Sequence, residues 1–263
     1  MKKLFFTHAF CICVIVSSSI IFISSCQKEI GTEQRTPSGS NSGAKIKSYN
    51  EKVTSSSINY DLTFNIGYDS KDRIISAIST SNNGDKFLFG YPSSSKLTMD
   101  LYNSGILSIH EDFFLNSSSF IDSTFQYNDT QDTMTEKYFY NVYRQLVKVK
   151  EYMYSKLTGS TLDNTTDYTY DANGNLIKTV DTNTNENTYQ YYPDLVYVYP
   201  IIRPLMPGED KKRNLTKKRI LKSNGYLVAS IDYIYTFDAK DRVETIKGTY
   251  DDGSVVLQTF VYY

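Results

Sequence analysis

The stretch from Tyr168 to Val180 sets the pattern that the rest of this chain repeats. Two short runs of β-forming residues that alternate in polarity flank the polar segment 171–175, Asp-Ala-Asn-Gly-Asn. Its Asn-Gly pair tolerates the positive φ that tight turns need, so the stretch predicts a β-hairpin. The same order of residues returns at 68–74 and 237–243, with looser copies at 102–105, 221–225 and 250–253. A chain built from such units is expected to fold as consecutive hairpins.

The segments between these turns show a period of two. Tyr60 to Tyr68 is the clearest, because every second residue is apolar or aromatic, which indicates one buried face. No comparable stretch shows helical spacing. The sequence therefore predicts an all-β protein, an antiparallel meander of roughly ten or more strands that forms one large curved sheet or an open barrel. Residues 138–154 carry few turn residues and are compatible with one longer element.

We place this single all-β domain at residues 58–263, with a loop at 193–214, where four of the six prolines lie. Residues 1–25 have two lysines, a long apolar run and two final serines, as signal peptides do. Ile23-Ser24-Ser25-Cys26 resembles the lipobox of bacterial lipoproteins, in which Cys26 becomes the lipidated first residue. Residues 26–57 are polar and rich in Ser, Gly, Thr and Lys, which predicts a lipidated Cys followed by a flexible tether.

Lipidation predicts where the protein resides. Two or three acyl chains give a stable membrane anchor. We therefore expect an exported protein held at the outer membrane by its lipid, without crossing it, and facing either the periplasm or the cell surface.

The cysteine and histidine content excludes several chemistries. Cys11, Cys13 and His8 lie in the predicted signal peptide, so the mature chain keeps only Cys26, which carries lipid, and His110. The body then has no disulfide, no cysteine zinc site and no cysteine nucleophile. Without the two lysines of the signal peptide, 26 basic residues stand against 29 acidic ones. That balance, without a basic stripe, argues against a nucleic-acid partner.

Asp69, Asp171 and Asp238 recur at the first position of the turns. Asp at that position accepts hydrogen bonds from backbone amides two residues on, so we interpret these three residues as turn caps. The segments that begin at Asp171 and Asp181 imitate the start of an EF-hand loop but lack its Gly and its final acid. His110 lacks the second His of a zincin and any Gly-x-Ser-x-Gly partner. We assign no catalytic residue, no metal site and no cofactor.

The candidate binding residues are mostly aromatic. Tyrosines on an exposed sheet face can stack on sugar rings, and several lie beside or within the proline-rich segment. The residues that we name for binding are Tyr191, Tyr192, Tyr197, Tyr199 and Arg203. The alternative is that these tyrosines form the core and rim of a Tyr-rich sheet. Trp, which glycan-binding faces favour, is absent from the chain.

The Asp-containing turns resemble the YD-type (Tyr-Asp) repeats of large bacterial repeat proteins. The end of the chain is also similar to lipoproteins of Gram-negative gut-type bacteria that form a family of unknown function. The basic stretch 213–218, the segment 232–243 and the lipobox carry this resemblance. The sequence departs from the YD pattern at Asp72 and Asp241, where Gly is usual. The resemblance implies an antiparallel meander and an exported lipoprotein, and it implies no reaction.

Two classes of function remain open. The first is a non-enzymatic module of the cell envelope, binding or structural, whose partner is a glycan, a peptide or a protein. The second is a carboxylate-dependent hydrolase that acts on envelope or dietary glycans, because a pair of acids is the machinery of glycoside hydrolysis. Buried acids that converge in the fold would favour the enzyme. Solvated turn acids and an aromatic face would favour the binding module.

Overall fold

The computed structural model describes residues 45–81, 84–128, 133–155, 159–198 and 212–263. These residues form sixteen β-strands and no helix, hence no helix that could span a membrane. In chain order the strands are β1 (Ile46–Thr54), β2 (Asn59–Tyr68), β3 (Ile74–Ser79), β4 (Lys86–Ser93), β5 (Lys96–Asn103), β6 (Ile106–Leu115), β7 (Ile121–Asn128), β8 (Thr133–Tyr140), β9 (Leu146–Ser155), β10 (Gly159–Tyr170), β11 (Leu176–Asp181), β12 (Asn185–Val198), β13 (Lys212–Ser223), β14 (Tyr226–Phe237), β15 (Val243–Tyr250) and β16 (Val255–Tyr262).

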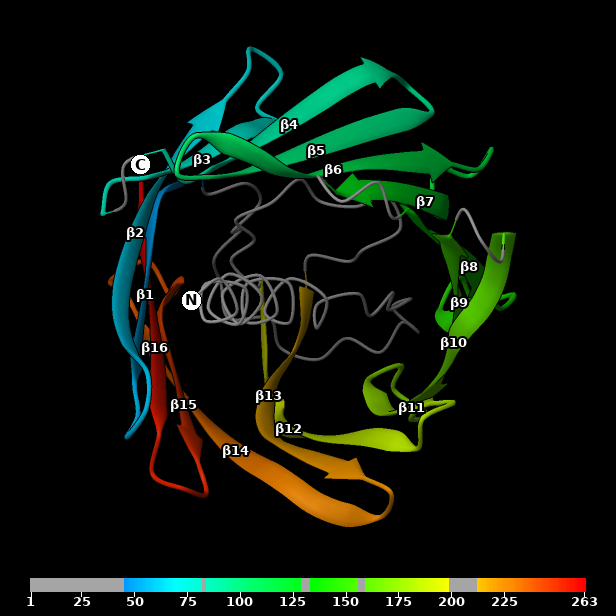
Figure 1. Cartoon of the computed structure of the whole chain (residues 1–263). Helices are drawn as coiled ribbons and strands as arrows, with labels where there is room; N and C mark the ends of the chain where they lie inside the picture. The colour runs from blue at the N-terminus through cyan, green and yellow to red at the C-terminus, as the bar shows by residue number, and fades with distance from the viewer. Residues whose placement is uncertain (1–44, 82–83, 129–132, 156–158, 199–211) are drawn as a thin grey trace.

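The strands close into an antiparallel barrel. Each strand pairs with its neighbours in the chain, and β1 pairs with both β16 and β2 (Figure 1). The predicted all-β antiparallel meander is confirmed, and its closed form replaces the predicted curved sheet or open barrel. Closure pairs the backbone groups that two free sheet edges would leave unsatisfied.

The first strand corrects the predicted domain boundary. The sequence predicts a flexible tether over 26–57, but Ile46–Thr54 form β1 and complete the barrel. A register irregularity between Ile46 and Ser48 breaks the period of two, and polar residues fill most other positions, so the alternation is hidden in the sequence. The predicted signal peptide and Cys26 lie outside the described residues.

The second correction concerns the predicted loop at 193–214. β12 continues to Val198 and β13 begins at Lys212, so both strands extend into that range, while residues 199–211 lie outside the described part. Pro193 falls where the register between the two strands shifts, between Tyr191 and Val196, and its missing amide therefore interrupts no regular ladder.

Five turns share one hydrogen-bonding plan. The side chain at the first position accepts hydrogen bonds from the amides two and four residues later; for Asp171 these are 2.9 and 2.8 Å long. The residue at the fourth position has a positive φ, as Gly174 does at 84°. These capped turns begin at Asp69, Asn116, Asn141, Asp171 and Asp238. The interpretation of the three aspartates as turn caps is confirmed, and the turn at Asn141 divides 138–154 into two strands.

Tyrosine hydroxyls form hydrogen bonds that link several capped turns to another strand. The aliphatic residue that follows the turn is buried, and its carbonyl accepts a hydrogen bond from a tyrosine further along the chain. Tyr262 donates to Val243 at 2.8 Å, and Val243 is 0% exposed. The other pairs of this kind are Tyr91 to Ile74, Tyr170 to Leu146 and Tyr191 to Leu176. Much of the tyrosine content therefore serves the barrel itself.

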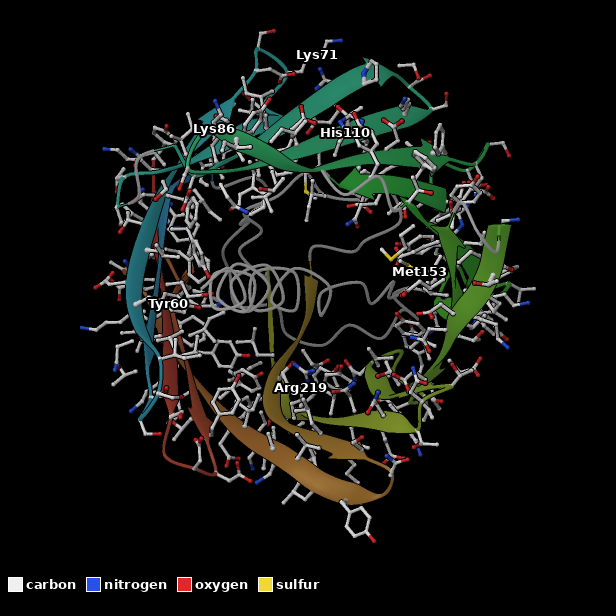
Figure 2. All side chains as sticks on the ribbon, in the orientation of Figure 1. Tyr60, Lys71, Lys86, His110, Met153 and Arg219 are labelled. Atoms are coloured by element: carbon white, nitrogen blue, oxygen red, sulfur yellow. The ribbon has the colours of Figure 1, made fainter. Side chains whose placement is uncertain are left out.

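The inner face of the barrel carries the main hydrophobic core. Tyr60, Met153 and Arg219 point into the barrel (Figure 2), and strand alternation then assigns every second residue to the inner or the outer face. The buried residues of the core come from β1 to β5, β13, β15 and β16: Ile46, Tyr49, Phe64, Ile66, Ile74, Ala77, Phe87, Leu101, Leu215, Val243, Ile246 and Phe260. The apolar side of this sheet therefore faces inward.

The meander places its turns alternately at two ends of the barrel. Lys45 leads into β1 and Tyr263 leaves β16 at one end, where the amide of Tyr263 donates to the Lys45 carbonyl at 3.1 Å. All five capped turns lie at this end, and Asp72 of one of them pairs with Lys45. We call it the entry end. The opposite, far end holds short turns such as Ser104–Gly105.

Candidate functional site

Ion pairs join neighbouring strands across the outer face of the barrel. The pairs are Lys96–Asp112 at 2.8 Å, Lys148–Asp167 at 3.1 Å, Lys178–Glu186 at 2.5 Å and Lys218–Asp232 at 3.4 Å. These pairs are partly exposed and contribute little to stability. Their importance here is that they place charged groups on the outer face of the barrel.

Part of this outer face is aromatic. Phe125 of β7 and Tyr152 of β9 lie in register on either side of Thr135 in β8, and Tyr127 and Tyr154 flank Thr133 in the same way. Two strand spacings separate the side chains of each row by about 10 Å, and the rows lie about 7 Å apart. Phe125, Tyr127 and Tyr154 are 37%, 40% and 46% exposed. We call Phe125, Tyr127, Tyr152 and Tyr154 the outer aromatic frame.

His110 borders the frame on the side of β6. Its ring stacks on Tyr127 with the centroids 4.8 Å apart. Its Nδ1 lies 2.5 Å from Asp100 and its Nε2 lies 3.1 Å from Asp112. Contacts at both nitrogens fix the ring plane, so His110 extends the row of Tyr127 and does not stand alone.

Lys137 and Lys150 border the frame toward the entry end, where they face each other in register. The Lys137 ammonium lies 5.7 Å from the centre of the Tyr152 ring, and the Lys150 ammonium lies 5.7 Å from that of Phe139. Neither lysine has an ion pair with a carboxylate of the described residues. Like charges directly opposite each other destabilise a strand pair, so this position favours a bound anion.

The inner face holds acids as well as apolar side chains. Glu51 of β1 is 4% exposed and accepts hydrogen bonds from Tyr60 at 2.7 Å, from Gln258 at 3.0 Å and from the Tyr49 hydroxyl. Three donors satisfy the side-chain oxygens of Glu51, which is the condition for burying a polar group in a core. We interpret Glu51 as a structural group of the core.

A pair of acids on the inner face has perturbed protonation. Glu136 of β8 and Glu151 of β9 lie directly opposite each other. Burial raises the pKa of Glu136, and burial, Glu136 and Asp163 raise the pKa of Glu151 to about 7. Carboxyl groups in this situation hold a proton near neutral pH, as general acids do. No group of three or more potential metal ligands occurs in the described ranges.

The structure places the predicted binding residues in different surroundings. The Tyr191 hydroxyl donates to the Leu176 carbonyl at 2.7 Å, and that of Tyr192 donates to the Tyr233 carbonyl at 2.9 Å. Tyr197 belongs to β12, but its side chain, like Tyr199 and Arg203 as a whole, lies outside the described part. The assignment of these residues to binding stays a prediction.

The outer aromatic frame was not predicted from the sequence. Its residues come from two strands separated by a third, and only the register brings them into rows. The available signal was the alternation of Phe125 with Tyr127 in one strand and of Tyr152 with Tyr154 in another. Neither strand alone indicates which aromatic residues become neighbours.

Comparison with known proteins identifies the fold. No protein-family model and no curated protein sequence matches the chain. Two solved structures are similar: a porin-like protein from Bacteroides uniformis ATCC 8492, with a TM-score of 0.60, and one from Bacteroides vulgatus ATCC 8482, also at 0.60. Each is 12% identical; the matches cover 83% and 84% of this chain and 96% and 99% of the other two. At this identity the likeness shows the barrel fold.

Proposed function

We propose that this chain is an exported, lipid-anchored protein of a Gram-negative cell envelope whose barrel stands in water beside the outer membrane. In this proposal the barrel is a non-enzymatic binding or structural module, and the lipid on Cys26 is its attachment to the membrane. The source of the two similar solved structures agrees with such an envelope.

This proposal rests on the polarity of the outer face of the barrel. A barrel that crosses a bilayer needs an outward apolar band about 25 Å tall, and an arginine or lysine on its lipid face at the midplane costs about 2–4 kcal/mol. Here ion pairs such as Lys148–Asp167 and Lys218–Asp232 lie on the outer face, while the aliphatic core lies inside. Charge pairs outside and the main hydrophobic core inside do not form the uninterrupted apolar outer band that lipid contact requires. A water-exposed barrel therefore needs a separate anchor, and Cys26 supplies one.

The position of the entry end agrees with this anchor. The chain reaches the barrel at Lys45, so the segment between Cys26 and Lys45 separates the lipid from the entry end. A flexible segment of that length has a root-mean-square reach of roughly 25 Å. In this arrangement the entry end is tied close to the membrane and the far end is free to face its surroundings.

One observation favours the second candidate function, a carboxylate-dependent hydrolase. Glu136 and Glu151 lie opposite each other, and the raised pKa of Glu151, about 7, suits a general acid. The binding module remains the main proposal because the aromatic surface is exposed to partners, whereas these two acids face the inside of the barrel. Glu136→Gln and Glu151→Gln variants assayed on glycan substrates test the alternative.

Cell fractionation tests the main proposal. Fatty-acid labelling should mark the wild-type chain and not Cys26→Ala. Residues 1–26 should also be replaced by a cleavable secretory signal without a lipobox. We expect the wild type to sediment with membranes and to enter the detergent phase, and the exchanged chain to be recovered folded in the aqueous fraction. Retention of the exchanged chain in membranes after a carbonate wash would contradict the proposal, because the barrel itself would then be the anchor.

A further inference from the structure

We infer that the outer aromatic frame, together with Lys137 and Lys150, is a binding site for an acidic glycan, a sugar chain that carries carboxylate or sulfate groups. The inference deepens the proposed function, because it names the partner of a binding module that stands in water at the membrane. It concerns a surface of β7 to β9, on the outside of the barrel.

The aromatic rows provide the contacts to sugar rings. In each row two aromatic side chains stand about 10 Å apart across a threonine, which leaves their outer parts uncovered. That separation is comparable to the length of a disaccharide. The faces of the aromatic rings pack well against the C–H groups of a pyranose. The Thr133 and Thr135 hydroxyls between the rings are able to donate to or accept from sugar hydroxyls. Two such rows side by side suit a chain rather than a single sugar.

The two lysines provide the preference for negative charge. Lys137 and Lys150 face each other beside the Thr135 row, and the Lys137 ammonium is held 5.7 Å from the centre of the Tyr152 ring. Other lysines of the outer face, such as Lys148 and Lys178, have a carboxylate partner within 3.1 Å. An anionic group bound between Lys137 and Lys150 would relieve their repulsion and accept hydrogen bonds from both ammonium groups.

The place of the surface in the barrel makes it available. Tyr127, Thr133 and Tyr154 lie at the ends of their strands that point away from the entry end. A barrel tethered at its entry end therefore presents this surface away from the membrane. The bordering contacts of His110 with Tyr127 and Asp112 hold one side of the frame in a fixed orientation.

The test uses the detergent-solubilised lipoprotein and affinity electrophoresis in gels that contain a defined polysaccharide. Polygalacturonate supplies carboxylates, chondroitin sulfate supplies sulfates together with carboxylates, and dextran is the neutral control. The wild type should be retarded by one or both acidic polymers and not by dextran. Sodium chloride should weaken the retardation, because exposed charges are screened.

Two sets of variants locate the site. Lys137→Gln combined with Lys150→Gln should weaken the affinity about tenfold or more, since hydrogen bonds to charged groups contribute at least that factor. Phe125→Ala with Tyr152→Ala should weaken it similarly. The matched control is Lys86→Gln, which removes an outer-face lysine 4.5 Å from the centre of the Tyr102 ring and should change nothing. Circular dichroism and thermal unfolding confirm that each variant is folded.

A direct reporter is also available, because the chain contains no Trp. Phe125→Trp introduces a single tryptophan into the frame, and its fluorescence should change when an acidic oligosaccharide is added. No binding to either acidic polymer, equal binding to dextran, or unchanged affinity in the lysine and aromatic variants would each overturn the inference. None of these results depends on how the chain is attached to the membrane, so the release experiment with the exchanged signal tests the proposed function separately.

Discussion

Removing the carboxylate that caps the turn between β14 and β15 should weaken the whole barrel. Asp238 Oδ1 accepts hydrogen bonds from the amides of Lys240 and Arg242, both at 2.9 Å, and Oδ2 contacts Nε and Nη2 of Arg242 at 2.7 and 2.6 Å. The side chains of Asp238 and Arg242 are 19% and 15% exposed, so solvent screens this pair only in part. Asp238→Ala removes all four contacts at once.

The expected cost follows from these contacts. Two amides lose a partner at about 1 kcal/mol each, and the partly screened contact to the guanidinium contributes about another 1 kcal/mol, so we expect a loss of roughly 2–3 kcal/mol. For a chain of this size that corresponds to a fall in Tm of roughly 5–10 °C. Asp238→Asn keeps an oxygen for the two amides but turns an NH2 donor toward the Arg242 guanidinium, so it loses the contacts to that guanidinium alone and should cost less than Asp238→Ala.

Urea unfolding followed by circular dichroism measures both variants, with unchanged m as the sign that the native fold persists. The pH dependence is a second readout. Desolvation opposes ionisation of Asp238, but the hydrogen bonds from Arg242 and Lys240 outweigh it and hold the pKa of Asp238 below its usual value. The stabilisation is therefore present above the unfolded pKa and is lost as the pH falls through the folded one. If Asp238→Ala and Asp238→Asn unfold at the same midpoint as the wild type, the capping argument is wrong.

Three further outcomes are expected. Tyr262→Phe leaves the buried Val243 carbonyl without its donor and should cost about 1–3 kcal/mol, whereas Tyr152→Phe on the outer face should stay within about 0.5 kcal/mol of the wild type in the same urea assay. Because the pKa of Glu151 is raised to about 7, wild-type stability should fall as the pH rises from the ordinary glutamate range through 7, and Glu151→Gln should flatten this fall in Tm measured against pH. Gly84→Ala brings a Cβ within 2.5 Å of the Gly105 amide nitrogen, whereas Gly105→Ala meets nothing within 4 Å, so thermal unfolding should show the first to be worse by about 1 kcal/mol or more. Equal midpoints within either matched pair, or an unchanged slope for Glu151→Gln, would contradict the corresponding argument.

Local chemistry explains which parts of the fold were predictable. The turns around Asp171 and Asp238 are determined by residues within five positions of one another: Asp at the first position and a residue of positive φ at the fourth. These hairpins can therefore be predicted from the sequence. The turn at Asn141 uses the same plan, but Asn replaces Asp and Arg144 takes the positive φ, so it resembles the others only once its hydrogen bonds are seen.

Neither the closure of the barrel nor the outer aromatic frame could be predicted from any single segment of the sequence. β1 pairs with β16, more than 190 residues away, and its register irregularity hides the alternation that would mark it as a strand. The rows of the outer aromatic frame depend on the registers of β7 with β8 and of β8 with β9. A shift of one residue in either pairing would turn one side of each row to the inner face.

The two faces of the barrel together explain why a fold similar to porin-like proteins does not by itself imply a pore. A closed barrel leaves no unpaired sheet edge, which is favourable in water as well as in lipid. The surrounding solvent determines only which face of the barrel is apolar. In this chain the apolar residues at alternate positions, such as Phe64, Ile246 and Phe260, meet inside, and lysines paired with acids lie outside. The alternation that identifies the strands therefore also indicates which face of a barrel is apolar, and here it supports the proposal that this barrel stands in water beside the membrane.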